Sequence, residues 1–325
     1  MSNKHRHVYN LSMKNQLLVL EDLAISKSDF ENLAIKAGLS FEFVYQQEDV
    51  IQNEAINGII TMKATVNVDK NLLIKYPNLK FIAVAFTGYD CINVEHCRQN
   101  NIAVFNVPNY ATNAVAELTI GLAISLIREI SMAEKVIHIG SWNSQLSGSE
   151  LYGKTVGILG TGTIGLRTAK LFQAFGSKII GWSRTQNEEF KKIGGEYISD
   201  LKQFIANADI LSIHLPLTTE TKNLLSFEEL SVMKTTAYLI NTARGPIINE
   251  KALIKILKDK KIAGAAIDVF DQEPLNSDNE LLQLENVILT PHIAYKTIEA
   301  QEKRALITIN NIADFLKDKR TNRVD

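Results

Sequence analysis

Short, apolar, β-branched runs alternate with helical patterns along nearly the whole chain, and this alternation limits the possible folds more than any other feature. In the first third of the chain the predicted strands are 16–20, 41–45, 58–61, 80–85 and 102–105. After residue 154 the predicted strands are 155–159, 178–182, 210–214, 237–241, 264–268 and 287–290. Strands of this length that are separated by helices form parallel sheets with crossover connections. The chain is therefore predicted to be α/β, with one sheet in each half.

One predicted helix is longer and more apolar than the others. It runs from Thr112 to about Ser131, with Thr112 or Asn113 as its N-cap, and its apolar positions cover more than one stripe. Such a helix packs on several sides, and we expect part of it to be buried in a homodimer. A glycine- and serine-rich loop, 140–153, follows the helix and is expected to flank that interface. A last amphipathic helix covers 297–317.

Composition and charge exclude several classes of protein. A chain of 325 residues corresponds to roughly two domains of about 150 residues. The 35 basic and 36 acidic residues leave a net charge of −1, which favours neither a nucleic acid nor an anionic membrane as a partner. No apolar run is long enough to cross a membrane and no signal-peptide pattern is present, so we expect a cytoplasmic protein. No His or Cys cluster with metal-ligand spacing surrounds Cys91 and Cys97, and the sequence predicts no metal site.

Residues 160–165, Gly-Thr-Gly-Thr-Ile-Gly, match the pattern G-x-G-x-x-G, which is informative only between a strand and a helix. Both neighbours are predicted here, because a buried-strand pattern precedes the motif and apolar residues follow it at helical spacing. Gly160 permits the tight turn, Gly162 lets the backbone approach a pyrophosphate, and Gly165 lets helix and strand pack closely. The N-terminus of the helix then faces the phosphates, so the sequence predicts a dinucleotide site.

The residues at the end of the next strand distinguish between two dinucleotides. An acidic side chain there would accept hydrogen bonds from the ribose hydroxyls of NAD and repel the 2′-phosphate of NADP. The expected acidic position is Ser183, and Arg184 follows it. A hydroxyl beside a guanidinium suits a phosphate, so the sequence predicts NAD(P) as cofactor with some preference for NADP(H).

Three polar elements follow the later strands of the second sheet. They are Asn-Thr-Ala-Arg-Gly at 241–245, Asp-Val-Phe-Asp-Gln-Glu-Pro-Leu at 268–275, and Thr-Pro-His-Ile-Ala at 290–294. Because ligands of an open parallel sheet bind beyond the carboxyl ends of its strands, all three are expected to converge on the dinucleotide cleft. An arginine, a carboxylate and a histidine at one edge can bind a carboxylate substrate and move a proton.

These elements resemble those of the D-isomer-specific 2-hydroxyacid dehydrogenases, and the resemblance covers nearly the whole chain. Besides the segments above it rests on Thr-Gly-Tyr-Asp at 87–90, Asn-Val-Pro-Asn-Tyr at 106–110, Val-Ala-Glu at 115–117 and His-Leu-Pro-Leu-Thr at 214–218. The resemblance implies a flavodoxin-like substrate domain formed by residues 1–111 and 296–325. It also implies an inserted Rossmann domain, a doubly wound parallel sheet, formed by residues 112–295.

The resemblance also implies a mechanism of hydride transfer between a nicotinamide cofactor and C2 of a small D-2-hydroxy acid or 2-keto acid. Arg244 would bind the substrate carboxylate, and His292 would be the general acid and base. Glu273 would hold the imidazole and favour its protonated form, because a nearby anion stabilises the cation.

The predicted site residues, some taken from the motifs above and some implied by the resemblance, form two sets. The cofactor set is Gly160, Gly162, Thr163, Ile164, Gly165, Ser183, Arg184, Leu215, Pro216, Thr242, Ala243, Arg244, Asp268, His292 and Ala294. The substrate set is Lys63, Arg244, His292 and the backbone around Thr87 and Gly88. The expected substrates are glyoxylate, hydroxypyruvate, pyruvate or a similar acid.

Two alternatives stay open at this point. A dinucleotide-sensing binding protein, like the corepressor relatives of the family, would keep this fold but usually carries extensions for docking proteins. Only about 14 residues precede the first predicted strand here and about 30 follow His292, which favours an enzyme. A short form of phosphoglycerate dehydrogenase is the other alternative.

Overall fold

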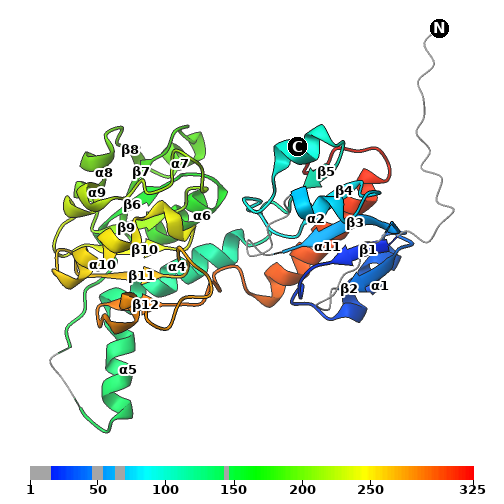
Figure 1. Cartoon of the computed structure of the whole chain (residues 1–325). Coiled ribbons are helices and arrows are strands. Elements are labelled where there is room, and N and C mark those ends of the chain that lie inside the picture. Colours follow the sequence, from blue (N-terminus) through cyan, green and yellow to red (C-terminus); the bar gives the residue numbers. More distant parts are fainter. Residues whose placement is uncertain (1–15, 46–53, 63–69, 143–145) are drawn as a thin grey trace. The chain divides into compact units, whose positions relative to one another are not determined.

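The chain divides into two compact units, unit 1 with residues 1–110 and 298–325 and unit 2 with residues 111–297 (Figure 1). The computed structural model describes residues 16–45, 54–62, 70–142 and 146–325. Each unit contains one sheet, and every described strand pair is parallel. The predicted α/β class with two parallel sheets is therefore confirmed. None of the helices in the described part of the chain combines the length and the apolar character needed to cross a membrane.

The sheet of unit 1 has the strand order β2-β1-β3-β4-β5, which is the flavodoxin-like order. Its strands are β1 (Gln16–Val19), β2 (Glu42–Tyr45), β3 (Ile56–Thr61), β4 (Phe81–Val84) and β5 (Ala103–Phe105). Its helices are α1 (Lys27–Lys36), α2 (Lys70–Ile74), α3 (Val94–Gln99) and α11 (Ile298–Phe315). The last helix of the chain thus folds with its first third.

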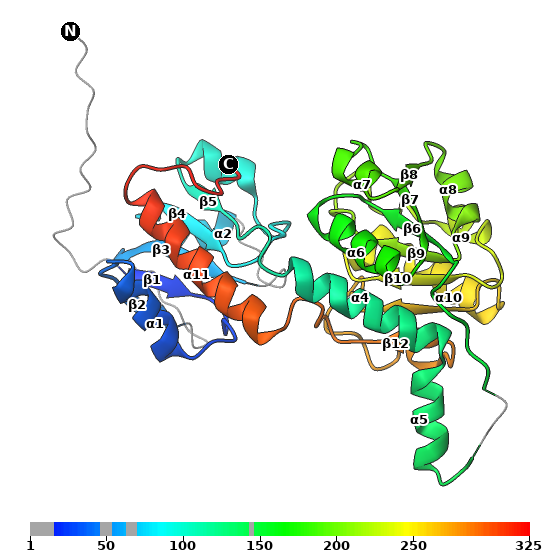
Figure 2. The same cartoon turned by 180° about the vertical axis from the view of Figure 1, so that it is seen from behind.

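Both faces of this sheet are buried because alternate strand residues point to opposite sides. Leu17 packs on one face with Phe30 of α1 and Ile309 of α11. Its neighbour Leu18 packs on the other face, where Cys97 of α3 is also buried. Helices α1 and α11 therefore cover one face of the sheet, and α2 and α3 cover the other (Figure 2).

The sheet of unit 2 has the order β12-β11-β10-β9-β6-β7-β8. Its strands are β6 (Thr155–Leu159), β7 (Lys178–Trp182), β8 (Glu196–Tyr197), β9 (Ile210–Ile213), β10 (Tyr238–Asn241), β11 (Gly264–Ile267) and β12 (Val287–Leu289). The first six of these strands have the doubly wound Rossmann order, and β12 extends it. The order reverses between β6 and β9, where such folds bind ligands. The sequence did not predict β8, since two residues are too few to form a pattern.

The helices of unit 2 cover both faces of its sheet, apart from one that extends away from it. They are α4 (Thr112–Ile127), α5 (Ile130–His138), α6 (Thr163–Ala174), α7 (Glu188–Lys192), α8 (Leu201–Asn207), α9 (Phe227–Ser231) and α10 (Glu250–Lys258), with single 3₁₀ turns at Gly245–Ile247 and Glu280–Gln283. Helices α4, α6 and α7 pack on one face, and α8, α9 and α10 pack on the other. The strands are thereby buried on both sides, as parallel strands usually are.

The prediction of one long helix to Ser131 was wrong in two respects. The helix α4 ends at Ile127, the backbone of Glu129 is left-handed with φ 54°, and a separate helix α5 begins at Ile130. The N-cap is Ala111, with no side-chain hydrogen bond, so neither predicted residue caps the helix. The apolar surface of α4 is buried within unit 2, against α6 and strands β10, β11 and β12. By contrast α5 has no buried residue and extends away from the sheet (Figures 1 and 2).

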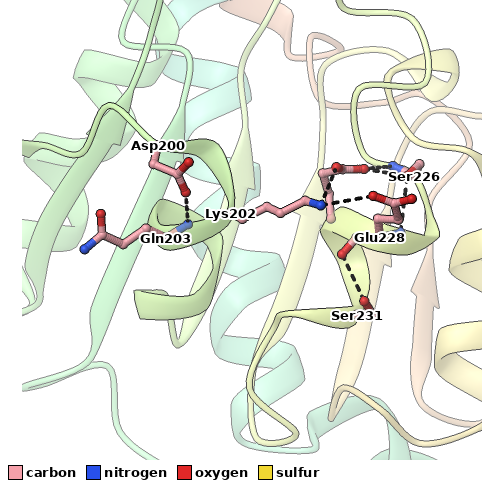
Figure 3. Close-up of polar contacts among 7 residues, drawn as sticks. Asp200, Lys202, Gln203, Ser226, Glu228 and Ser231 are labelled. Atoms are coloured by element: carbon pink, nitrogen blue, oxygen red, sulfur yellow. Dashed lines mark hydrogen bonds and ion pairs between the residues drawn. The ribbon is translucent and has the colours of Figure 1, made fainter.

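Ion pairs join helices α8 and α9 at the surface, and a cap stabilises the start of each helix (Figure 3). Asp200 accepts a hydrogen bond from the first turn of α8, and Ser226 and Glu229 form a capping box at the start of α9. Nζ of Lys202 lies 3.0 Å from a carboxylate oxygen of Glu228. Water screens such an exposed pair, whereas an N-cap hydrogen bond contributes about 1 kcal/mol. The caps therefore matter most for α9, which has only five residues.

Candidate active site

The glycine motif forms the turn between β6 and α6. Gly160 has φ +99°, and a Cβ there would lie 2.8 Å from the carbonyl carbon of His214. A Cβ on Gly165 would lie 2.0 Å from the carbonyl oxygen of Gly160, so both positions require glycine. Gly162 is the N-cap of α6 without a side-chain hydrogen bond, and a Cβ there would meet nothing within 4 Å. The amides of Thr163 and Ile164 thus begin a twelve-residue helix at an open N-terminus, which suits a pyrophosphate.

Ser183 and Arg184 follow β7, the strand beside the glycine motif. Ser183 is partly exposed and Arg184 is exposed. The pKa of Glu220 is lowered, mainly by a hydrogen bond from Thr218, and the charge of Arg184 contributes to this lowering. A carboxylate therefore lies near the guanidinium that we expect at the 2′-position of the cofactor ribose.

Arg244 lies in a tight loop at the carboxyl end of β10. Asn241, at the end of that strand, accepts a hydrogen bond from the amide of Ala243 at 3.0 Å. Its amide nitrogen donates to the carbonyl of Arg244 at 2.9 Å, so one side chain joins both ends of the loop. The guanidinium of Arg244 donates to the carbonyl of Ala243 at 2.8 Å. The buried Asn241 thus positions Arg244, a role that its place at a strand end could have suggested.

The hydroxyl of Thr242, in the same loop, is oriented by helix α4. Thr119 of α4 is fully buried and donates its hydroxyl hydrogen to the carbonyl of Val115 at 2.8 Å. Its oxygen lies 3.1 Å from the hydroxyl of Thr242 and is left to accept from it. Sequence reasoning did not find Thr119, because the contact joins residues far apart in the chain.

His292 and Glu273 form a close pair. Nδ1 of His292 lies 2.6 Å from Oε2 of Glu273, and Oε1 of Glu273 accepts a hydrogen bond from the amide of Phe270 at 3.0 Å. Burial acts to raise the pKa of Glu273, but the hydrogen bond and charge of His292, the Phe270 amide and the charge of Arg244 together lower it below its usual value. The carboxylate is therefore ionised at neutral pH and keeps a proton on Nδ1, so Nε2 is the nitrogen that can exchange a proton with a substrate.

Asp268 holds the loop that carries His292. Its carbonyl accepts a hydrogen bond from the amide of His292, whose backbone is left-handed with φ 52°. Its side chain accepts from the hydroxyl of Thr290 at 2.6 Å and from the amides of Ile293 and Ala294 at 2.9 Å each. The carboxylate is fully buried, and burial raises its pKa although these hydrogen bonds act to lower it. These contacts maintain a costly backbone conformation at His292. The expected contact between Asp268 and the cofactor stays a prediction.

Leu215 and Pro216 follow β9, next to the turn at Gly160. The histidine before them, His214, has its Nε2 atom 2.8 Å from the hydroxyl of the buried Ser212. Removal of its ring from water lowers the pKa of His214 to about 3. The ring is therefore neutral at neutral pH and adds no charge to this part of the site.

The remaining substrate residues belong to unit 1. Thr87 and Gly88 follow β4, at the carboxyl end of the sheet. The hydroxyl of Thr87 donates to the carbonyl of Val107 at 2.9 Å, so backbone groups are the ones that this loop offers to a ligand. Lys63 lies outside the described residues. The structure thus brings the glycine motif and the Arg244, Glu273 and His292 elements to one edge of the second sheet, with Thr87 and Gly88 in the other unit.

Comparisons with known proteins agree with the fold of two parallel sheets. Residues 120–294 match the family model of the D-isomer specific 2-hydroxyacid dehydrogenase, NAD binding domain. A glyoxylate reductase of Thermofilum pendens is 40% identical over 277 residues, which cover 83% of this chain and 82% of that protein. The structure of a D-lactate dehydrogenase of Aquifex aeolicus, complexed with NAD and lactic acid, is 30% identical with a TM-score of 0.85. It covers 95% of this chain and 99% of that one.

A second solved structure differs in the cofactor bound. An acyclic imino acid reductase in complex with NADPH and D-Arg is 30% identical, with a TM-score of 0.84, and covers 95% of this chain and 100% of that one. Two proteins of nearly equal similarity to this chain thus hold different dinucleotides. The fold alone therefore does not select the cofactor.

Proposed function

Because this chain belongs to the D-isomer specific 2-hydroxyacid dehydrogenase family, we propose that it reduces a small 2-keto acid with NADPH, using Arg244, Glu273 and His292. The observation that carries this assignment of roles is the 2.6 Å pair of His292 and Glu273 at the same sheet edge as Arg244 and the glycine motif. The family is one of oxidoreductases that transfer hydride between a nicotinamide cofactor and C2 of a hydroxy or keto acid. The substrates that we expect are glyoxylate, hydroxypyruvate and pyruvate.

The residues present suit a bound dinucleotide. The turn between β6 and α6 leaves no room for a side chain at Gly160 or Gly165. The open N-terminus of α6 presents backbone amides to a pyrophosphate. The loops at Leu215 and Thr242 would hold the two ends of the molecule. When bound, the nicotinamide supplies or accepts the hydride, and the protein supplies orientation and the proton.

The protein part of the reaction is proton transfer and charge stabilisation. Arg244 binds the substrate carboxylate through its guanidinium and polarises the carbonyl. The imidazolium of His292 donates its Nε2 proton to the carbonyl oxygen during reduction, and the neutral ring takes it back during oxidation. Glu273 holds Nδ1 and fixes the orientation of the ring. Asn241 and Asp268 keep the arginine and histidine loops in place through the hydrogen bonds described above.

We propose NADP(H) rather than NAD(H) as the preferred cofactor. Ser183 stands where an acidic residue would repel the 2′-phosphate, and the exposed Arg184 can attract that phosphate. The carboxylate of Glu220 near Arg184 reduces this attraction without removing it, so we expect a moderate preference.

We also propose a homodimer, formed through α5 rather than α4. On and beside α5 the large apolar side chains of Ile130, Ile137, Ile139 and Trp142 are between 49% and 87% exposed. A hollow of about 500 Å³ between α4 and α5 is lined by apolar and charged residues, Arg128 and Glu134 among them. A group of exposed apolar side chains on a projecting helix is typical of a protein interface. In a two-fold symmetric dimer, the side chains of α5 in each copy would be covered by the other copy.

A spectrophotometric screen tests the function. The purified protein is incubated with each of glyoxylate, hydroxypyruvate, pyruvate and 3-phosphohydroxypyruvate, with NADPH and NADH in parallel. We expect oxidation of the nicotinamide with a small 2-keto acid and little with the phosphorylated one. Faster turnover of 3-phosphohydroxypyruvate would instead support the phosphoglycerate dehydrogenase alternative. Dinucleotide binding without turnover of any keto acid would support the binding-protein alternative.

A further inference from the structure

Three asparagine side chains connect the loop after β4 with helix α11 and the C-terminal residues of unit 1. Nδ2 of Asn106 donates to the carbonyl of Thr87 at 2.7 Å. Nδ2 of Asn311, on α11, donates to the carbonyl of Asn106 at 2.8 Å. Nδ2 of Asn322 donates to Oδ1 of Asn311, also at 2.8 Å. Asn106 and Asn311 are only 9% and 2% exposed, so this is a buried network in which each amide has defined partners.

The network determines the direction of one peptide group. Because a trans peptide is planar, its C=O and the N–H of the next residue point in opposite directions. The carbonyl of Thr87 points at Asn106, so the N–H of Gly88 points away from it. The hydroxyl of Thr87 is held at the carbonyl of Val107, and the amide of Val107 donates to the carbonyl of Phe86 at 2.9 Å. Three hydrogen bonds thus join the loop after β4 to the loop after β5.

The C-terminal residues support this arrangement from the edge of the sheet. Residues 322–325 lie along β5, where Phe105 and Arg323 form an antiparallel bridge and the amide of Val324 donates to the carbonyl of Val104 at 2.9 Å. The side chain of Asp325 accepts from the amide of Val104 at 2.8 Å. The amide of Asn106 donates to the carbonyl of Asn322 at 3.2 Å. Asn106 is therefore held on its backbone N–H, its backbone carbonyl and its side chain.

We propose that Asn106 is a positioning residue that directs the amide of Gly88 toward the carboxylate of the 2-keto acid, with Asn311 and the C-terminal residues holding Asn106. This proposal rests on the proposed function, in which the backbone around Thr87 and Gly88 binds that carboxylate. It differs from a purely structural role, in which Asn106 would only satisfy buried carbonyl groups and its loss would lower stability alone.

The test removes the side-chain donor of Asn106 by substitution and then restores a donor at the same place by protonating the new side chain at low pH. In Asn106→Asp the ionised side chain cannot donate to the carbonyl of Thr87, whereas the protonated side chain can. Affinity is measured by calorimetry with oxamate, a non-reacting 2-keto acid analogue, on the enzyme saturated with dinucleotide. At about pH 8 we expect the variant to bind oxamate about 10-fold more weakly than the wild type, with unchanged dinucleotide affinity.

Lowering the pH should rescue the variant. A carboxyl group that faces a carbonyl oxygen in a buried place has a raised pKa, so it becomes protonated well above its usual range. We expect the ratio of the two oxamate dissociation constants, variant over wild type, to fall at least about threefold between about pH 8 and about pH 6. Asn310→Asp, on the exposed side of α11, introduces the same charge without touching the network and should give a ratio near one at both values.

A second variant covers the case in which Asn106→Asp fails to fold. Asn311→Asp keeps the acceptor for Asn322 but loses the donor to Asn106, and we expect a smaller weakening of oxamate binding with the same recovery at low pH. Unchanged oxamate affinity, or an equal weakening of dinucleotide and oxamate binding, would overturn the proposal. If the wild type binds oxamate but reduces no keto acid, the proposed function fails while these ratios still decide the role of Asn106.

Discussion

Nδ1 of His292 lies 2.6 Å from Oε2 of Glu273, and the second oxygen of that carboxylate is held by the amide of Phe270. The histidine ring is thus fixed in one orientation by a carboxylate that is itself fixed by the backbone. Its own backbone is held in a left-handed conformation by hydrogen bonds to Asp268. A ring constrained at both its side chain and its backbone is suited to proton transfer at Nε2, since that chemistry requires a defined donor position.

Removing the ring should abolish turnover. We expect His292→Ala to lower kcat by about 10²- to 10⁴-fold, because a positioned acid contributes that much to the rate. The affinity for NADPH, measured by fluorescence titration, should stay near that of the wild type. A variant that keeps most of its reductase activity would show that another residue supplies the proton.

The rate of reduction should fall when the carboxylate is neutralised. Since the pKa of Glu273 is below its usual value, this side chain is an anion throughout the neutral range and accepts the hydrogen bond of Nδ1 of His292. In Glu273→Gln the neutral amide can turn either its oxygen or its NH₂ group toward Nδ1, so the ring is no longer held in the form that leaves Nε2 for the substrate. We expect kcat for reduction to fall about 10-fold or more, with an unchanged affinity for NADPH. A kcat equal to that of the wild type would separate Glu273 from the proton transfer.

The arginine should not be replaceable by another cation. Arg244→Lys keeps the charge but cannot present two parallel N–H groups to a carboxylate, so we expect a loss of about 10²-fold in kcat/KM for the keto acid. The KM for NADPH should change little. Unaltered kcat and KM would place Arg244 outside the substrate site.

Cofactor preference should follow the residues at the end of β7. A charge-assisted hydrogen bond to phosphate is worth about 1.5–3 kcal/mol, or roughly 10- to 150-fold, so Arg184→Ala should lower kcat/KM for NADPH by up to that factor. Ser183→Asp should make NADH the better cofactor, because it accepts from the ribose hydroxyls and repels the phosphate. Glu220→Gln should raise the NADPH preference, as it removes the carboxylate near Arg184. The comparison is kcat/KM for both dinucleotides in each variant, and a strong wild-type preference for NADH would contradict the assignment.

The oligomer should depend on α5. We expect a dimeric mass for the wild type by light scattering at micromolar concentration, and a monomeric mass for Ile137→Asp, because a charge would then have to be buried at the interface. Ile74→Asp in unit 1 is the matched control, since Ile74 is 62% exposed and Ile137 is 54% exposed. A monomeric wild type, or a dimer that survives the change at Ile137, would exclude this interface.

Much of the architecture was predictable from local patterns. The strands Thr155–Leu159 and Lys178–Trp182 begin and end where their apolar runs do, because a buried parallel strand is a continuous apolar segment. The positions of Arg244, Glu273 and His292 after successive strands could be read in the same way, since the carboxyl ends of parallel strands share one edge. Such features depend on residues that are neighbours in sequence, and a single sequence is enough to identify them.

Other features depend on contacts between distant residues. The break between α4 and α5 carries no glycine or proline. The amide of Ser149 caps the carbonyl of Ile127 at 2.7 Å, and a Cβ on Gly148 would lie 2.6 Å from that oxygen. The direction of the Gly88 amide likewise depends on Asn106, Asn311 and Asn322, which meet only after α11 and the C-terminal residues have packed on unit 1. The sequence by itself determined the elements, the glycine turn and the order of the polar residues. Only the tertiary structure decided where the long helix stops and how the substrate loop is oriented, because hydrogen bonds between distant segments form only once the core has brought those segments together.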